Sequence, residues 1–127
     1  MTDYTFLGRI NFSYLEIEFG KLQTDEVIIT NERLHHIQER HPEDYDLFFT
    51  YSKSIILSPD IVLLDSKNAG TVFFVKSLDG SNLNIVIRVA LETDAVGRKN
   101  SVMTFYRIRD KNLKKLENKS KTLYKRE

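Results

Sequence analysis

Residues 30–42 read TNERLHHIQERHP, a helical segment that carries its own start signal and stop signal. Thr30 or Asn31 can cap the start of the helix with a side-chain oxygen. Pro42 disfavours the helical conformation at the residue before it, so the helix should end at about Arg40. This stretch therefore predicts one well-delimited helix in the first half of the chain.

A helical wheel at about 100° per residue divides this helix into two arcs. One arc holds Arg33, Leu34, His36, Ile37, Arg40 and His41. The opposite arc holds Glu32, His35, Gln38 and Glu39, which we interpret as facing solvent. Because cations are costly to bury without partners, the first arc should face a cleft or a set of charged partners rather than a dry core.

The side chains of the first arc suit the chemistry of a phosphodiester. Imidazoles can give and accept protons near neutral pH, which makes His36 and His41 candidate catalytic groups. Guanidinium groups bind phosphate through paired hydrogen bonds, which makes Arg33 and Arg40 candidate substrate-binding groups. The alternative is structural: the arginines pair with nearby carboxylates, and His41 simply ends the helix.

A zinc site built from the three histidines is not expected. Adjacent histidines on a helix, such as His35 and His36, point about 100° apart. The chain contains no cysteine that could complete a thiolate site. The same absence excludes a disulfide framework and thiolate catalysis, and it fits a cytoplasmic setting.

Working outward from the helix, the pattern predicts an α+β domain. Before the helix, residues 5–19 look extended, and a short apolar piece follows at residues 27–29. A second helix should start at Pro42 and run to about Tyr51. The chain then becomes rich in β-branched and aromatic residues, with strands expected at 61–64, 71–78, 82–91 and 101–109. A hairpin turn is expected at 79–82, a helical pattern from Asp110, and partial disorder over 119–127.

Three of the expected strands each place one polar side chain in an apolar setting. These side chains are Lys76, Arg88 and Thr104. Together they could line a concave sheet surface that holds a phosphodiester. The alternative is that the two cations are ordinary surface charges and that the threonine is only a good strand former.

The bulk composition bounds the kind of protein. A chain of 127 residues, of which 41% are hydrophobic, can build one domain with its own core. No apolar run approaches the roughly 20 residues of a membrane span, and the first residues lack the features of a signal peptide. We therefore expect a single domain over residues 1–127 with no membrane partner.

Charge is distributed unevenly along the chain. Residues 1–65 carry 12 acidic and 5 basic side chains, a net charge of −7. Residues 66–127 carry 14 basic and 6 acidic side chains, a net charge of +8. A basic half suits a polyanionic partner such as RNA, but the two halves can also simply attract each other.

Residues 30–42 resemble the helix motif of phage and mobile-element nuclease domains of the barnase–EndoU–colicin–RelE class, hereafter the BECR class. The shared pattern, Glu-Arg-x-x-His-Ile-x-x-Arg-His-Pro, spans residues 32–42. Weaker matches are SPD at 58–60, the strand that ends in Lys76, SVMTFYRIR at 101–109 and LYK at 123–125. The resemblance covers about residues 25–125 and leaves residues 1–24 outside it.

The resemblance implies a fold of N-terminal helices packed on a four-stranded antiparallel sheet, as in barnase and RelE, with a C-terminal helix. It implies metal-independent cleavage of RNA by attack of the 2′-hydroxyl, with no cofactor and with an immunity protein or antitoxin as a possible partner. The implied catalytic residues are His36, His41, Lys76 and Thr104. The implied substrate-binding residues are Arg33, Arg40 and Ser101. Arg88 is added to them because of the side of its strand that it faces, and not because of the resemblance.

Two questions stay open at this stage. No glutamate is placed to act as the general base that some members of the class use, so the division of acid and base between the histidines is open. Two rivals to an active nuclease also remain. One is a catalytically silent module that binds RNA or protein, and the other is a mobile-element component that acts on a single partner protein.

Overall fold

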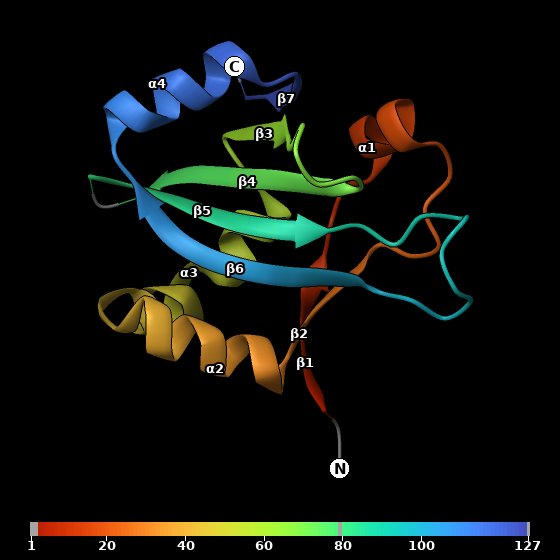
Figure 1. Cartoon of the computed structure of the whole chain (residues 1–127), viewed down its shortest axis with the longest axis horizontal. Coiled ribbons are helices and arrows are strands. Elements are labelled where there is room, and N and C mark those ends of the chain that lie inside the picture. The colour runs from red at the N-terminus through yellow and green to blue at the C-terminus, as the bar shows by residue number, and fades with distance from the viewer. Residues whose placement is uncertain (1–2, 79, 127) are drawn as a thin grey trace.

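A mixed sheet forms the centre of the computed structural model, which describes residues 3–78 and 80–126. Within these residues the sheet has seven strands in the order β1-β2-β6-β5-β4-β3-β7 (Figure 1). All neighbouring pairs are antiparallel except β2 and β6, which are parallel. The strands are β1 (Tyr4–Arg9), β2 (Glu26–Thr30), β3 (Ile61–Leu64), β4 (Thr71–Leu78), β5 (Ser81–Arg88), β6 (Asn100–Ile108) and β7 (Thr122–Lys125). The helices are α1 (Ser13–Phe19), α2 (Asn31–Arg40), a 3₁₀ turn (Pro42–Asp44), α3 (Tyr45–Leu57) and α4 (Asp110–Lys119).

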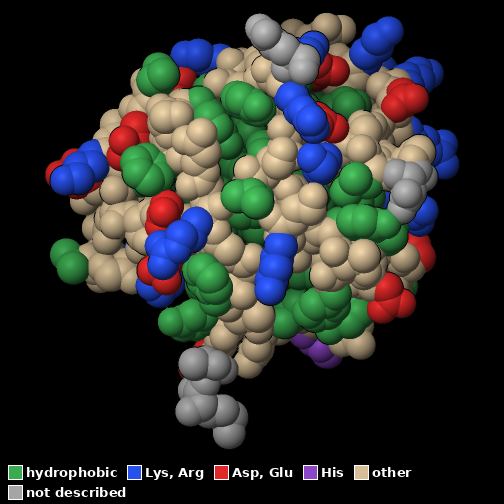
Figure 2. Space-filling view, turned by 180° about the vertical axis from the view of Figure 1, so that it is seen from behind, with side chains coloured by type: hydrophobic (Ala, Val, Ile, Leu, Met, Phe, Trp, Pro, Cys, Tyr) green, Lys and Arg blue, Asp and Glu red, His purple; other side chains and the backbone are tan. Residues whose placement is uncertain are grey.

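One face of the sheet is covered by the main hydrophobic core. Cross-strand pairing places Phe74, Ile85 and Phe105 side by side on this face, and all three are fully buried. Helices α1, α2 and α3 pack against it, with α3 behind the central strands in Figure 1. A buried side chain of this size contributes about 1.5–3 kcal/mol, so this layer holds the helices in place. Seen from behind, the surface combines hydrophobic patches with interspersed basic and acidic side chains (Figure 2).

The other face of the sheet is covered only in part. Leu113 and Leu116 of α4 pack against the small cluster of Ile61, Leu63 and Val75, above β3 and β4. In Figure 1 no helix stands in front of β5 and β6 on this side. We call this part of the sheet the open face because no helix covers it, although Asn82, Asn84 and Val86 on it are 8% exposed or less. In the part of the chain that the structure describes, no helix combines the length and the apolar character needed to cross a membrane.

The helix expected from residues 30–42 is confirmed. Thr30 caps it, because its Oγ1 accepts a hydrogen bond of 3.2 Å from the backbone N–H of Arg33. The helix ends at Arg40, and Pro42 begins the 3₁₀ turn that leads into α3. The second helix continues beyond Tyr51 to Leu57.

The expectation of an extended chain over residues 5–19 is wrong for its second half, where α1 forms. The partial alternation there also fits a helix that buries one side: Leu15 is fully buried, whereas Ile17 is 88% exposed. The Glu16 carboxylate accepts a hydrogen bond from the backbone N–H of Leu22 and closes the loop behind the helix.

The expected four-stranded sheet corresponds to β3, β4, β5 and β6, and the structure adds three further strands. The C-terminal segment expected to be partly disordered contains β7, because it pairs with the edge of β3 from Ile61 to Leu63. The expected turn at 79–82 includes Asp79, which lies outside the described residues. Leu78 pairs with Ser81 across this turn, and Gly80 adopts a positive φ of 76°.

Candidate active site

Helix α2 lies beside β6 along most of the length of that strand. Strand β2 pairs with β6 only at Asn100 and Ser101, so the remainder of β6 extends beyond β2, and α2 packs next to it (Figure 1). The apolar residues of the arc predicted for α2 face the hydrophobic core, and Ile37 is fully buried there. The spacing i, i+3, i+7 puts Arg33, His36 and Arg40 on one flank of the helix.

A cleft of about 650 Å³ opens at the C-terminal end of α2, and we call it the His41 cleft. Its lining comes from the helix end, the β4–β5 turn and the end of β6. The lining residues are His41, Glu43, Asp44, Gly80, Ser81, Asn82, Tyr106, Arg107, Ile108, Arg109 and Asp110. The rings of His41 and Tyr106 are in contact, with centroids 5.8 Å apart and planes inclined by 32°. Two side chains that can exchange protons therefore face the same cleft.

Tyr106 is set up to keep its proton. Burial raises the pKa of its hydroxyl above the ordinary value of 10.0, the nearby Asn84 amide offsets part of this rise, and the Asp65 carboxylate adds to it. At neutral pH the phenol is consequently a proton donor and not a base.

The two arginines of the cleft, Arg107 and Arg109, differ in whether they have an ion-pair partner. The carboxylate of Asp44, only 6% exposed, lies 2.6 Å from Nε of Arg107. Asp44 also accepts a hydrogen bond of 3.4 Å from the backbone N–H of Arg107. A buried carboxylate of this kind fixes the direction of the guanidinium group. Arg109 makes no ion pair with any residue that the structure describes, so its charge is available to a ligand.

Next to Tyr106, the open face carries a polar group without a partner. Asn84 pairs with Tyr106 across β5 and β6, and Thr104 pairs with Val86, which puts these polar side chains on one face. The Asn84 amide acts on the Tyr106 hydroxyl, whereas the buried Thr104 hydroxyl makes no hydrogen bond to any residue within 3–78 and 80–126. An unpaired buried polar group costs about 1–3 kcal/mol, so its presence calls for a purpose other than stability.

A second, smaller pocket of about 450 Å³ lies at the N-terminal end of α2, and we call it the cationic pocket. Its lining includes four basic side chains from α2, β5 and the loop before β6, together with one acidic and several apolar ones. The lining residues are Ile28, Thr30, Glu32, Arg33, Arg88, Val89, Arg98, Lys99, Ser101 and Met103. Lys99 pairs with Glu26 at 2.9 Å, and this hydrogen bond raises the pKa of the lysine and lowers that of the glutamate.

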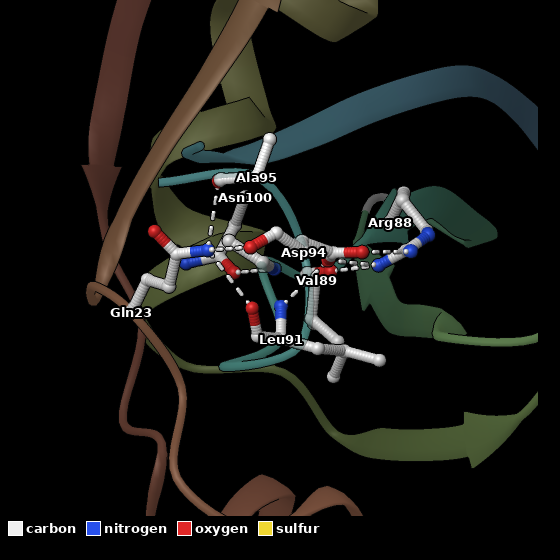
Figure 3. Close-up of polar contacts among 8 residues, drawn as sticks. Gln23, Arg88, Val89, Leu91, Asp94, Ala95 and Asn100 are labelled. Atoms are coloured by element: carbon white, nitrogen blue, oxygen red, sulfur yellow. Dashed lines mark hydrogen bonds and ion pairs between the residues drawn. The ribbon is translucent and has the colours of Figure 1, made fainter. Parts of the chain in front are cut away.

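Arg88 is tied into the loop between β5 and β6 (Figure 3). Its two terminal nitrogens contact the Asp94 carboxylate at 3.0 and 2.9 Å, and this pairing is the main reason why the pKa of Asp94 is lowered. Gly70 lies so close to Arg88 that an added Cβ would sit 2.7 Å from the guanidinium. The side-chain amide of Gln23 donates to the carbonyls of Leu91, Asp94 and Ala95, which holds the same loop against the start of β2.

Among the described residues, four ion pairs join the basic half of the chain to the acidic half. They are Lys99–Glu26, Arg107–Asp44, Lys121–Glu18 and Arg126–Asp60. Part of the charge asymmetry is thus satisfied inside the molecule. Of the basic residues that line the cleft and the pocket, Lys99 and Arg107 take part in these four pairs.

The family model for phage-Barnase-EndoU-ColicinE5/D-RelE like nuclease3 matches residues 8–115. The chain belongs to this family. The match contains α2, the His41 cleft and the cationic pocket, and it confirms the resemblance to BECR-class nucleases. It begins earlier than the resemblance suggested and ends before β7. No curated protein and no solved structure matches the chain.

In this member of the BECR-class nuclease family, the expected site residues lie in several different places. His41 lines the cleft, Thr104 lies on the open face, and Arg33, Arg88 and Ser101 line the cationic pocket. His36 and Arg40 lie on the flank of α2.

Lys76 is separated from the other expected site residues. It pairs with Leu83 on the core face of the sheet, opposite Arg88 and Thr104. It is 8% exposed, and its Nζ donates a hydrogen bond of 2.6 Å to the carbonyl of Ser58. These contacts describe a side chain that ties β4 to the end of α3.

Several residues of the site are not singled out by the sequence. Strand periodicity places Tyr106 on the same face as Thr104 but assigns it no task, and it gives no sign that Arg107 and Arg109 reach a cleft. Glu43 has the position of a helix-start charge, yet it lines the cleft with His41. In the described part of the chain, no group of three or more His, Asp or Glu side chains is arranged to hold a metal ion.

Proposed function

We propose that this chain is a metal-independent endoribonuclease and that the His41 cleft is its active site. The contact between His41 and Tyr106 in a cleft with two arginines carries this proposal. Membership in a family of BECR-class nucleases supports it. Cleavage of RNA needs no external nucleophile, because the 2′-hydroxyl of the substrate can attack the adjacent phosphorus.

His41 acts as the general base in this proposal. It accepts the proton of the 2′-hydroxyl as the oxygen forms a bond to phosphorus. The bond from phosphorus to the 5′-oxygen breaks, and Tyr106 donates its phenolic proton to that oxygen. The products are a 2′,3′-cyclic phosphate and a free 5′-hydroxyl. Solvent then returns a proton to Tyr106 and removes the one that His41 took.

The remaining groups of the cleft stabilise and position the substrate. Arg107 and Arg109 bind the phosphoryl oxygens, where negative charge increases during the reaction. Asp44 is a positioning residue, since its carboxylate orients the guanidinium group of Arg107. Thr104 does not line the cleft, and its hydroxyl is buried on the same face of β6 as Tyr106, so we assign it a positioning role toward that residue.

Other candidates are assigned more distant tasks or none. Glu43 is one of three carboxylates in the cleft, with Asp44 and Asp110, and it becomes the base if His41 serves as an acid instead. His36 and Arg40 contact the strand as it runs along α2. Lys76 has no task in this mechanism, because it lies on the opposite face of the sheet.

The test is cleavage of mixed RNA by the purified protein in EDTA. We expect RNA to be cut to cyclic-phosphate ends and DNA of the same sequence to stay intact, since DNA lacks the attacking hydroxyl. His41→Ala should lower kcat by a factor of about 10²–10⁴, the usual contribution of a positioned acid or base. His35→Ala is the matched control, because His35 is exposed on the outer arc and pairs only with Glu39 at 3.0 Å.

Two results would overturn the proposal. The first is equal cleavage by the wild type and by His41→Ala. The second is RNA binding with no cleavage by the wild type on any RNA tested, which would identify a silent binding module. An active nuclease should also harm cells that express it, and His41→Ala should remove this toxicity. A protein that suppresses the toxicity by binding the chain would be the immunity protein or antitoxin that the family resemblance implies.

A further inference from the structure

The cationic pocket and the His41 cleft lie at the two ends of one strip of surface. Helix α2 runs from Thr30 beside the pocket to His41 in the cleft, and β6 runs from Ser101 to Tyr106 between the same two places. Ten helical residues rise about 15 Å, and five strand steps cover about 17 Å. These two independent measures agree on the separation of the two sites.

Between the two sites, the positive charge comes from the flank of α2. Arg33, His36 and Arg40 follow one another along the flank of α2. On the sheet, Arg88 and Ser101 share the open face with Thr104. A polyanion laid along α2 would therefore meet Arg33, His36 and Arg40 in turn.

The positive charge that the pocket offers comes from two arginines, and the exposed carboxylate of Glu32 in the same lining offsets part of it. Arg88 is paired with Asp94 and Lys99 with Glu26, so these ion pairs shape the pocket and contribute little net charge. Arg33 is half-buried in the wall and makes no ion pair with a described residue. Arg98 is exposed at the rim and acts on Asp94 only at a distance.

We propose that the cationic pocket binds a backbone phosphate of the same RNA strand that is cut in the His41 cleft. The proposal rests on the proposed function for the identity of the strand. At about 3.4 Å per nucleotide of a stacked strand, a separation of about 15 Å corresponds to roughly four nucleotides. The pocket therefore sets a minimum length for tight binding, and it makes the protein select strands over dinucleotides.

The test measures binding instead of cleavage. Wild type and the double variant Arg33→Gln/Arg98→Gln are titrated into fluorescent RNA oligonucleotides of two and eight nucleotides. All 2′ positions carry O-methyl groups, so attack is impossible. Lys53→Gln is the control for loss of a positive charge away from the pocket, because Lys53 is exposed on α3 in the layer behind the sheet. Thermal unfolding of each variant shows that it is folded.

The double variant should weaken binding of the octanucleotide about tenfold and leave binding of the dinucleotide unchanged. It should also reduce the slope of log affinity against log salt by about 0.7 for each phosphate that the variant no longer neutralises. Equal weakening for both lengths, or none for either, would overturn the proposal. If the octanucleotide binds more weakly as expected while wild type cleaves no RNA, the pocket stands as a strand-binding site and the nuclease proposal fails alone.

Discussion

Replacing Thr104 by valine should make the protein more stable and less active. The hydroxyl of Thr104 is buried on the open face without a hydrogen-bond partner among the described residues. Valine has nearly the same shape, suits a strand at least as well, and has no polar atom to desolvate.

The size of the effect follows from the cost of an unpaired group. Such a group costs about 1–3 kcal/mol, and we expect Thr104→Val to recover about 1 kcal/mol of unfolding free energy. For a domain of this length, that gain should raise Tm by about 3–5 °C. If the hydroxyl positions Tyr106, kcat/KM for RNA should fall by about tenfold, the factor that corresponds to losing about 1.4 kcal/mol of transition-state stabilisation.

The assay is chemical denaturation together with initial rates of RNA cleavage, and Thr30→Val is the control. The Thr30 hydroxyl caps α2 by accepting a hydrogen bond from the backbone N–H of Arg33, so its removal should destabilise the protein by about 1 kcal/mol. If Thr104→Val destabilises the protein as much as Thr30→Val, the hydroxyl is satisfied after all. If Thr104→Val is more stable and fully active, Thr104 has no part in the site.

Three further predictions concern residues around the site. Lys76→Met should leave kcat unchanged, since Lys76 lies on the core face, and a hundredfold loss of kcat measured on folded protein would return it to the mechanism. Gly70→Ala should lower the unfolding free energy by about 1–3 kcal/mol, because Gly70 has a φ of 73° and its Cβ would meet Arg88; a denaturation curve equal to that of the wild type would contradict this. The pKa of Asp94 is lowered in the folded state, so its stabilising effect is complete above the ordinary value of 3.8 and is lost as the pH falls through the lower folded value. The stability difference between wild type and Asp94→Asn should accordingly shrink between pH 6 and pH 3, and a constant difference would count against the pairing with Arg88.

Local signals make α2 predictable from sequence, whereas the sheet edges depend on distant pairing. The Thr30 cap and Pro42 delimit α2 within a few residues of chain. β7 forms only because β3 offers it a free edge about 60 residues away, which no local pattern announces. The same limit explains why the sequence predicts four strands of the sheet and the structure has three more.

The sequence predicts those parts of the site that depend only on which side of a single helix or strand a side chain faces. Strand periodicity correctly groups Thr104 with Tyr106, and it correctly groups Lys76 with Val72 and Phe74. It cannot show which of the two faces of β4 is covered by α3, so it does not separate Lys76 from Arg88. The contribution of Glu43 depends on the 3₁₀ turn, which brings it back toward the end of β6.

The most direct test of the central claim is the cleavage of a single RNA oligonucleotide in EDTA by wild type, His41→Ala and Tyr106→Phe. Tyr106→Phe keeps the ring beside His41 and removes only the proton donor. If the His41 cleft is the active site, the wild type should yield cyclic-phosphate products, and both variants should lose about a hundredfold or more in kcat. Undiminished cleavage by both folded variants, or cleavage by wild type only when a divalent metal is supplied, would contradict it.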